Sequence, residues 1–167
     1  ALVVGWVLLP PQAAFLWTGF VLLPFLLSAF LPLVARVIPR RSGITTGSHL
    51  RAFRFDLRVA LLQFGLRVAL LAHQALLMAD AIVRTLSRLN RRRGLLEWVP
   101  AAAAASDRKL ELFGFYRRMA GAVALAVGAA LVIVVADRDS WWIAIPLLGA
   151  WMLSPAIAWW VSRPPGF

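Results

Sequence analysis

The fold is decided by residues 119–161, which read MAGAVALAVGAALVIVVADRDSWWIAIPLLGAWMLSPAIAWWV. Two uncharged stretches, 119–136 and 140–161, flank a short charged sequence at 137–139. At about 1.5 Å per residue, each stretch is close to the length that crosses the ~30 Å hydrocarbon core of a bilayer as a helix. We therefore expect an antiparallel pair of membrane-spanning helices joined by a tight turn.

Tryptophan pairs lie at both ends of the second stretch. The spacing from Trp142 to Trp160 corresponds to about 27 Å of helix, so the pairs fall at opposite lipid–water interfaces, where tryptophan is enriched. We predict that four residues anchor this helix in the interfaces: Trp141, Trp142, Trp159 and Trp160.

The composition is that of an integral membrane protein. Of the 167 residues, 62% are hydrophobic and 15% are charged, against about 45–50% and 25% in soluble domains. The mean hydropathy is +0.80. The net charge of +11 comes from basic residues that flank apolar stretches, which indicates anionic lipid headgroups as partners rather than nucleic acid. The absence of cysteine excludes disulfides and thiolate metal sites.

The N-terminal part predicts two more helices. Residues 1–9 read as a truncated helix closed by Pro10 and Pro11, and a second helix is expected from about Ala13 to Val37. With the hairpin, this gives an all-α membrane fold of about four spanning helices, the first of them truncated. The chain reads as a piece of something larger.

Basic residues gather in two segments that the positive-inside rule assigns to the cytoplasm. The first cluster is Arg36, Arg40, Arg41, Arg51, Arg54 and Arg58, and the second comprises the basic residues from Arg84 to Arg118. The connection at residues 10–12 and the turn at 137–139 then face the opposite side. We therefore expect the chain to divide into three segments: 1–41, 42–100 and 101–167.

The segment from about His49 to Arg93 begins and ends on the same side, so it crosses the bilayer twice or not at all. Two polar stripes run along it at helical spacing: Asp56, Gln63, Arg67 and Gln74, and His73, Asp80, Arg84 and Arg91. Burying such charges at mid-bilayer costs about 2.5–3.5 kcal/mol each. We therefore expect a long amphipathic helix, or a helix pair, in the cytoplasmic interface. Its lipid anchors are Arg91, Arg92 and Arg93, joined by Arg117 and Arg118.

Three blocks of sequence resemble the membrane region of the cyclic β-1,2-glucan synthases. They are WTGFVLLPFLLSAFLPL at 17–33, HQALLMADAIVRTLSRLNRRRGLLEWVPAAAAA at 73–105 and WMLSPAIAWWVSRPP at 151–165. The resemblance implies a segment of a large bacterial inner-membrane enzyme. In that family a cytoplasmic glycosyltransferase domain uses UDP-glucose with a divalent metal, and this segment itself holds no cofactor and no catalytic site. Its implied partners are the rest of the parent chain and the growing β-glucan.

Several polar residues are candidates for the glucan path or interface: His73, Gln74, Asp80, Arg84, Glu97 and Trp98. Each also has a structural interpretation. Asp80 and Arg84 are spaced to pair on a helix surface, and Trp98 is placed to anchor in the interface. Tyr116 is expected to anchor there too, with a glucosylated primer as the alternative.

Other patterns are weaker. The sequence Asp137-Arg138-Asp139 has the D-x-D form of nucleotide-sugar transferases, but its position in a tight connection favours a turn. Small residues at 122, 126 and 130, and at 124 and 128, predict close packing of this helix against a neighbouring span. The rival function is a non-enzymatic membrane scaffold or transporter subunit that binds anionic lipid.

Overall fold

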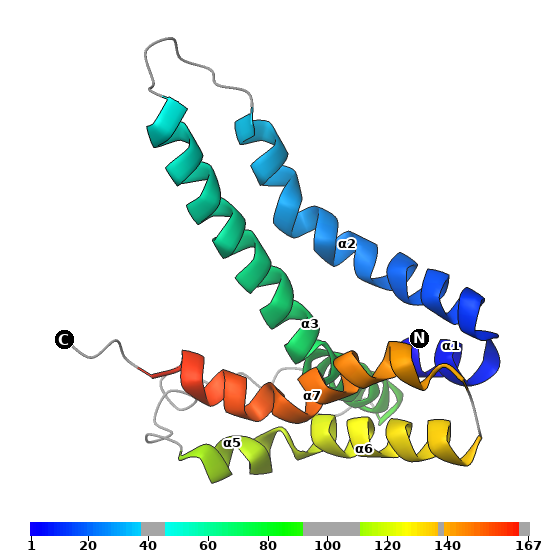
Figure 1. The fold of residues 1–167 in the computed structure, drawn as a ribbon. Helices are drawn as coiled ribbons and strands as arrows, with labels where there is room; N and C mark the ends of the chain where they lie inside the picture. Colours follow the sequence, from blue (N-terminus) through cyan, green and yellow to red (C-terminus); the bar gives the residue numbers. More distant parts are fainter. Residues whose placement is uncertain (38–45, 92–110, 137–138, 164–167) are drawn as a thin grey trace.

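A computed structural model describes residues 1–37, 46–91, 111–136 and 139–163. Within these ranges every regular element is a helix, as the sequence predicts (Figure 1). The elements are α1 (Leu2–Leu8), α2 (Pro11–Val37), α3 (Thr46–Arg91), α5 (Leu112–Arg118), α6 (Ala120–Val135) and α7 (Trp141–Val161).

Three of the described helices, α2, α3 and α7, are long and apolar enough to cross a membrane. A fourth span is formed if α5 and α6 are taken together, although they bend by 67° at Met119. The expected number of spans is therefore confirmed, but the set differs, because it includes α3 and leaves out the short α1.

Helix α3 is one continuous helix of 46 residues, about 69 Å long at ~1.5 Å per residue. The alternative of a helix pair is wrong, and a double crossing is excluded because a continuous helix does not reverse direction. No proline interrupts residues 46–91, so the backbone there can remain helical throughout. Helix α2 is also continuous, although it contains Pro24 and Pro32.

Helix α2 begins at Pro11, two residues earlier than predicted. Proline has no backbone N–H and a fixed φ, so it suits the first position of a helix, where the N–H has no helical partner. The proline pair therefore both ends α1 and opens α2. Residue Gly5 lets the two helices meet, because a Cβ there would lie 2.7 Å from Nε1 of Trp17.

Two tryptophans from opposite ends of the chain form the centre of the core. Trp6 of α1 is fully buried, and its ring centroid lies 5.8 Å from that of Trp151 in α7. The Nε1–H of Trp6 donates to Oγ1 of Thr18 at 2.9 Å, and that hydroxyl donates to the Ala14 carbonyl at 2.8 Å. The buried side chains of Trp6 and Thr18 thus both have hydrogen-bond partners, as an apolar environment requires.

One face of α6 packs into this core through small residues. Ala122 and Ala126 are fully buried, so the first small-residue row packs as predicted. The second row does not, because Ala124 and Gly128 are exposed in this chain. The two rows are about 200° apart on a helix, so one neighbour cannot cover both.

The connections α1–α2 and α6–α7 lie at the same end of the molecule (Figure 1). Phe15 and Trp142, near the two connections, stack with ring centroids 6.1 Å apart. The start of α2 therefore lies beside the start of α7, while the side of the membrane that they face stays a prediction.

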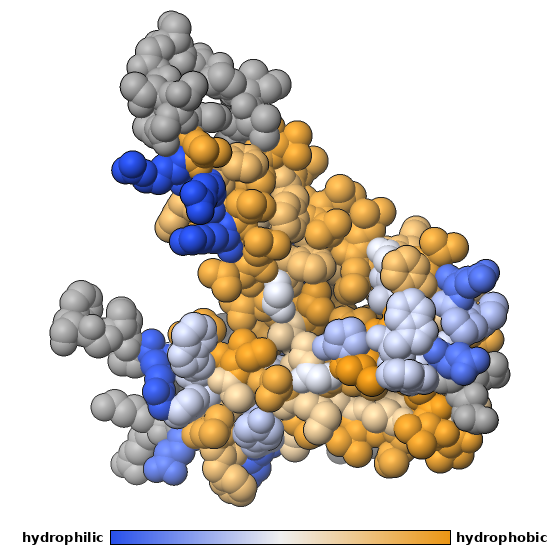
Figure 2. Space-filling view, viewed as in Figure 1, coloured by the Kyte–Doolittle hydropathy of each residue, from blue (hydrophilic) through white to orange (hydrophobic). Residues whose placement is uncertain are grey.

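The surface is apolar along the long helices. Figure 2 shows apolar side chains over much of α2 and the adjoining part of α3, with hydrophilic residues near the first turns of α3. Phe20 and Leu31 of α2 are 68% and 64% exposed. So much exposed apolar surface in a monomer marks contact with lipid or with other protein.

Candidate functional site

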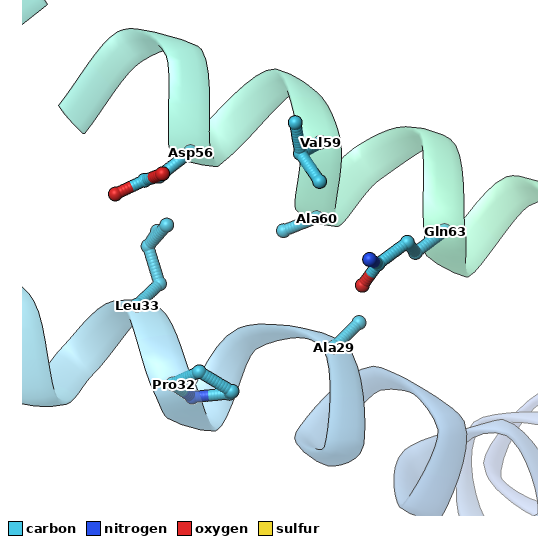
Figure 3. A pocket seen from close by; sticks show the side chains of 7 residues that line it. All are labelled: Ala29, Pro32, Leu33, Asp56, Val59, Ala60 and Gln63. Carbon is cyan, nitrogen blue, oxygen red and sulfur yellow. The ribbon is translucent and has the colours of Figure 1, made fainter. Parts of the chain in front are cut away.

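A groove between α2 and α3 brings polar groups together along the helix pair (Figure 3). Its volume is about 240 Å³. The residues that line it are Ala29, Pro32, Leu33, Asp56, Val59, Ala60 and Gln63. We call it the α2–α3 groove.

The polar groups of the groove come from α3. Asp56 and Gln63 are seven residues apart, which puts them on one face of the helix two turns from each other. In Figure 3 both side chains extend from α3 on the side that faces α2. The groove wall on α2 is apolar and consists of Ala29, Pro32 and Leu33.

The same stripe continues to Arg67, one turn beyond Gln63. The guanidinium Nη1 of Arg67 donates a hydrogen bond to Oγ of Ser28 in α2. The Ser28 hydroxyl in turn donates to the Phe25 carbonyl at 2.9 Å. The stripe that runs from Asp56 to Arg67 therefore faces a neighbouring helix, not headgroups alone.

Just beyond Arg67, α3 crosses the core. The Nε1–H of Trp151 donates to the Val68 carbonyl at 3.1 Å, and Ala69 and Ala72 are almost completely buried. The polar stripe consequently runs from the first turns of α3 up to an apolar barrier near the middle of the bundle.

The predicted site residues further along α3 do not join this groove. Arg84 Nε lies 2.8 Å from Oδ2 of Asp80, and the two side chains are 68% and 51% exposed. This is the surface pairing that the spacing indicates. His73 is half-buried and Gln74 is exposed. The structure brings none of these four side chains to Asp56 or Gln63, and their roles stay predictions.

Other predicted residues fall outside the described part of the chain. These are Arg92, Arg93, Glu97, Trp98, Asp137 and Arg138, and for Arg91 only the backbone is described. Among the described residues, no group of three His, Asp or Glu side chains lies close enough to hold a metal ion.

The predicted interfacial anchors lie at the ends of α5 and α7. Trp141, Trp142 and Trp160 are more than half exposed. The guanidinium carbon of Arg163 lies 3.6 Å from the centre of the Trp159 ring, a cation–π contact. Arg117 and Arg118 are exposed at the end of α5. Their contact with lipid stays a prediction.

Two features were not among the predicted site residues. A basic pocket of about 440 Å³ lies along the first turns of α3 and is lined by Leu50, Arg51, Arg54, Phe55 and Arg58. The spacing of three and four residues between its arginines is the sequence signal for it. For the α2–α3 groove the sequence predicted only the polar stripe on α3. It gave no indication of the helix that this stripe faces.

Tyr116 lies beside α7. Its hydroxyl is 3.5 Å from the Met152 carbonyl, to which it donates. This contact holds α5 along the C-terminal half of α7, so α5 is packed against the bundle.

Comparison with known proteins identifies a relative of this chain. The chain is 35% identical, over 164 residues and 98% of its length, to the cyclic beta-(1,2)-glucan synthase NdvB of Rhizobium meliloti (strain 1021). The match covers 6% of that protein, so the chain corresponds to a small part of its relative. No protein-family model matches the chain.

Proposed function

Because this chain is homologous to one segment of a cyclic β-(1,2)-glucan synthase, we propose that it is the membrane-embedded segment of such an enzyme. In this proposal it anchors a cytoplasmic glycosyltransferase domain, which uses UDP-glucose with a divalent metal, at the bacterial inner membrane. It also contributes helices to the route by which the β-glucan crosses the bilayer. The catalytic groups belong to other parts of the parent chain.

The observation that carries the proposal is the combination of a match along 98% of the chain with lipid-compatible helices in the matched part. The exposed residues of α2 and α7 are apolar along most of their length. In a bilayer such surface needs no further partner, whereas in water it would drive aggregation.

The anchoring role rests on the last third of α3. In this part the apolar side chains of Met78, Ile82, Leu86 and Leu89 lie on one face and are 59–67% exposed, while Leu77 and Val83, at 54% and 64% exposure, lie off that face. The opposite face carries Asp80, Arg84 and Arg88. Such a helix binds the boundary between acyl chains and headgroups, and its arginines attract anionic lipid. The proposed interfacial element is narrower than the 49–93 segment, because α3 also packs on α2, α6 and α7, with Arg67 and Val68 among its contacts.

We call the proposed contribution to glucan passage across the bilayer the path role. It is tested in inside-out inner-membrane vesicles that carry the full-length synthase. The 119–161 hairpin is replaced by an unrelated two-helix hairpin of the same length and topology. Vesicles are given UDP-[¹⁴C]glucose, and glucan inside the vesicles is separated from glucan outside. Total glucan after detergent treatment serves as the control for synthesis.

We expect the variant with the replaced hairpin to keep much of its glucan synthesis. Its glucan is expected to remain outside the vesicles. Product that still accumulates inside would refute the path role and leave anchoring alone. Membranes that make no glucan even with the native full-length protein would favour the rival scaffold function.

A further inference from the structure

The α2–α3 groove is a polar site in a stretch of chain that is otherwise suited to lipid. Both helices are candidate spans, and the groove lies within the apolar range 11–34 of α2. Polar and ionisable groups are costly at such positions and usually face the bundle interior or a water-filled cavity, where they mark substrate pathways.

The stripe on α3 is continuous with this groove. Asp56, Gln63 and Arg67 follow one face of the helix, and the last of them is held by Ser28 of α2. Arg67 has a fixed partner in Ser28, whereas the amide of Gln63 is exposed to the groove.

The chemistry of the groove favours an uncharged, hydroxyl-rich ligand. A carboxylate accepts hydrogen bonds and a primary amide both donates and accepts them, so Asp56 and Gln63 match the hydroxyls of a sugar. The aliphatic wall of Pro32, Leu33 and Val59 matches the C–H face of a sugar ring.

The size of the groove limits what fits. About 240 Å³ is below the ~300–1,000 Å³ that is usual for ligand pockets. The groove is therefore suited to one sugar residue at a time, not to a folded oligosaccharide.

We propose that the α2–α3 groove is a saccharide-binding site that holds a glucosyl residue of the growing chain through Asp56 and Gln63. This inference rests on the proposed function and adds the site to it. The proposed site differs from the candidates at residues 73–84, whose roles stay predictions, and lies in the N-terminal half of α3.

The test places a photocrosslinking amino acid, p-benzoylphenylalanine, at Gln63 of the full-length synthase in inside-out vesicles. The matched control carries it at Leu62, which is 65% exposed and does not line the groove. Vesicles synthesise glucan from UDP-[¹⁴C]glucose and are then irradiated. We expect radioactive glucan on the protein substituted at residue 63 and none above background at residue 62.

A second readout uses Gln63→Leu, with Leu62→Ala as its control. Removal of the amide is expected to lower glucan accumulation in the vesicles roughly 2- to 13-fold, the loss of one hydrogen bond. The control is expected to accumulate glucan as the native protein does.

The outcomes separate this proposal from the one it rests on. If glucan accumulates in the vesicles but none is crosslinked at residue 63, the saccharide site is refuted and the path role stands. If accumulation falls in Gln63→Leu without crosslinking, the amide is structural and the site is again refuted. If, in addition, replacement of the 119–161 hairpin leaves accumulation unchanged, the saccharide site and the path role both fail, and the anchoring role alone remains.

Discussion

The Trp6–Thr18 hydrogen bond offers a quantitative test of how the α1–α2 corner is held. Both side chains are buried, at 0% and 7% exposure, and the donor and acceptor are 2.9 Å apart. Thr18→Val leaves the indole N–H without a partner in an apolar site, which costs about 1–3 kcal/mol. Trp6→Phe removes the donor and part of the ring, and we expect a loss of about 1–3 kcal/mol, chiefly from packing against Trp151.

The two changes together isolate the hydrogen bond. In the double variant Trp6→Phe/Thr18→Val neither group is orphaned, so the combined loss is expected to be smaller than the sum by about 0.6–1.7 kcal/mol, the range for hydrogen bonds between membrane helices. The measurement is the free energy of unfolding of each purified variant in detergent micelles. If the losses of the two single variants add up to the loss of the double variant within ~0.3 kcal/mol, the two side chains are not coupled.

Three further predictions follow from the packing. Gly5→Ala should displace the Trp17 ring and lower the melting temperature in detergent, and an unchanged value would contradict the close approach at this residue. Ala126→Leu should cost about 1–3 kcal/mol of unfolding free energy by overpacking the core, while Gly128→Ala, which has open space around it, should cost nothing; equal losses would refute the assignment of the buried face. Arg84→Ala should change the unfolding free energy by no more than about 0.5 kcal/mol, because its pair with Asp80 is exposed; a larger loss would mean that the pair has a buried partner elsewhere.

Much of the helical fold could be predicted because a bilayer leaves the backbone few choices. Uncharged stretches in a bilayer must satisfy their own N–H and C=O groups, so 13–35 and 140–161 had to be helices. The position of α3 was harder. A stripe such as Asp56, Gln63 and Arg67 has the same spacing whether it faces headgroups or another helix.

The missing information was non-local. Ser28 lies 39 residues before Arg67, and no local pattern links the two. The break between α5 and α6 was equally hidden, because no proline lies near Met119. Periodicity identified the polar face of α3, but only packing identifies what that face meets.

The central tryptophan pair has a consequence for biosynthesis. Trp6 and Thr18 are 12 residues apart along the chain, so their hydrogen bond requires only that α1 and α2 have been synthesised. Trp151 follows some 145 residues behind Trp6, a delay of roughly 7–30 s at ~5–20 residues per second. During that interval Trp151 does not yet cover the indole face of Trp6. The contact between the two tryptophans therefore forms only after α7 has been synthesised.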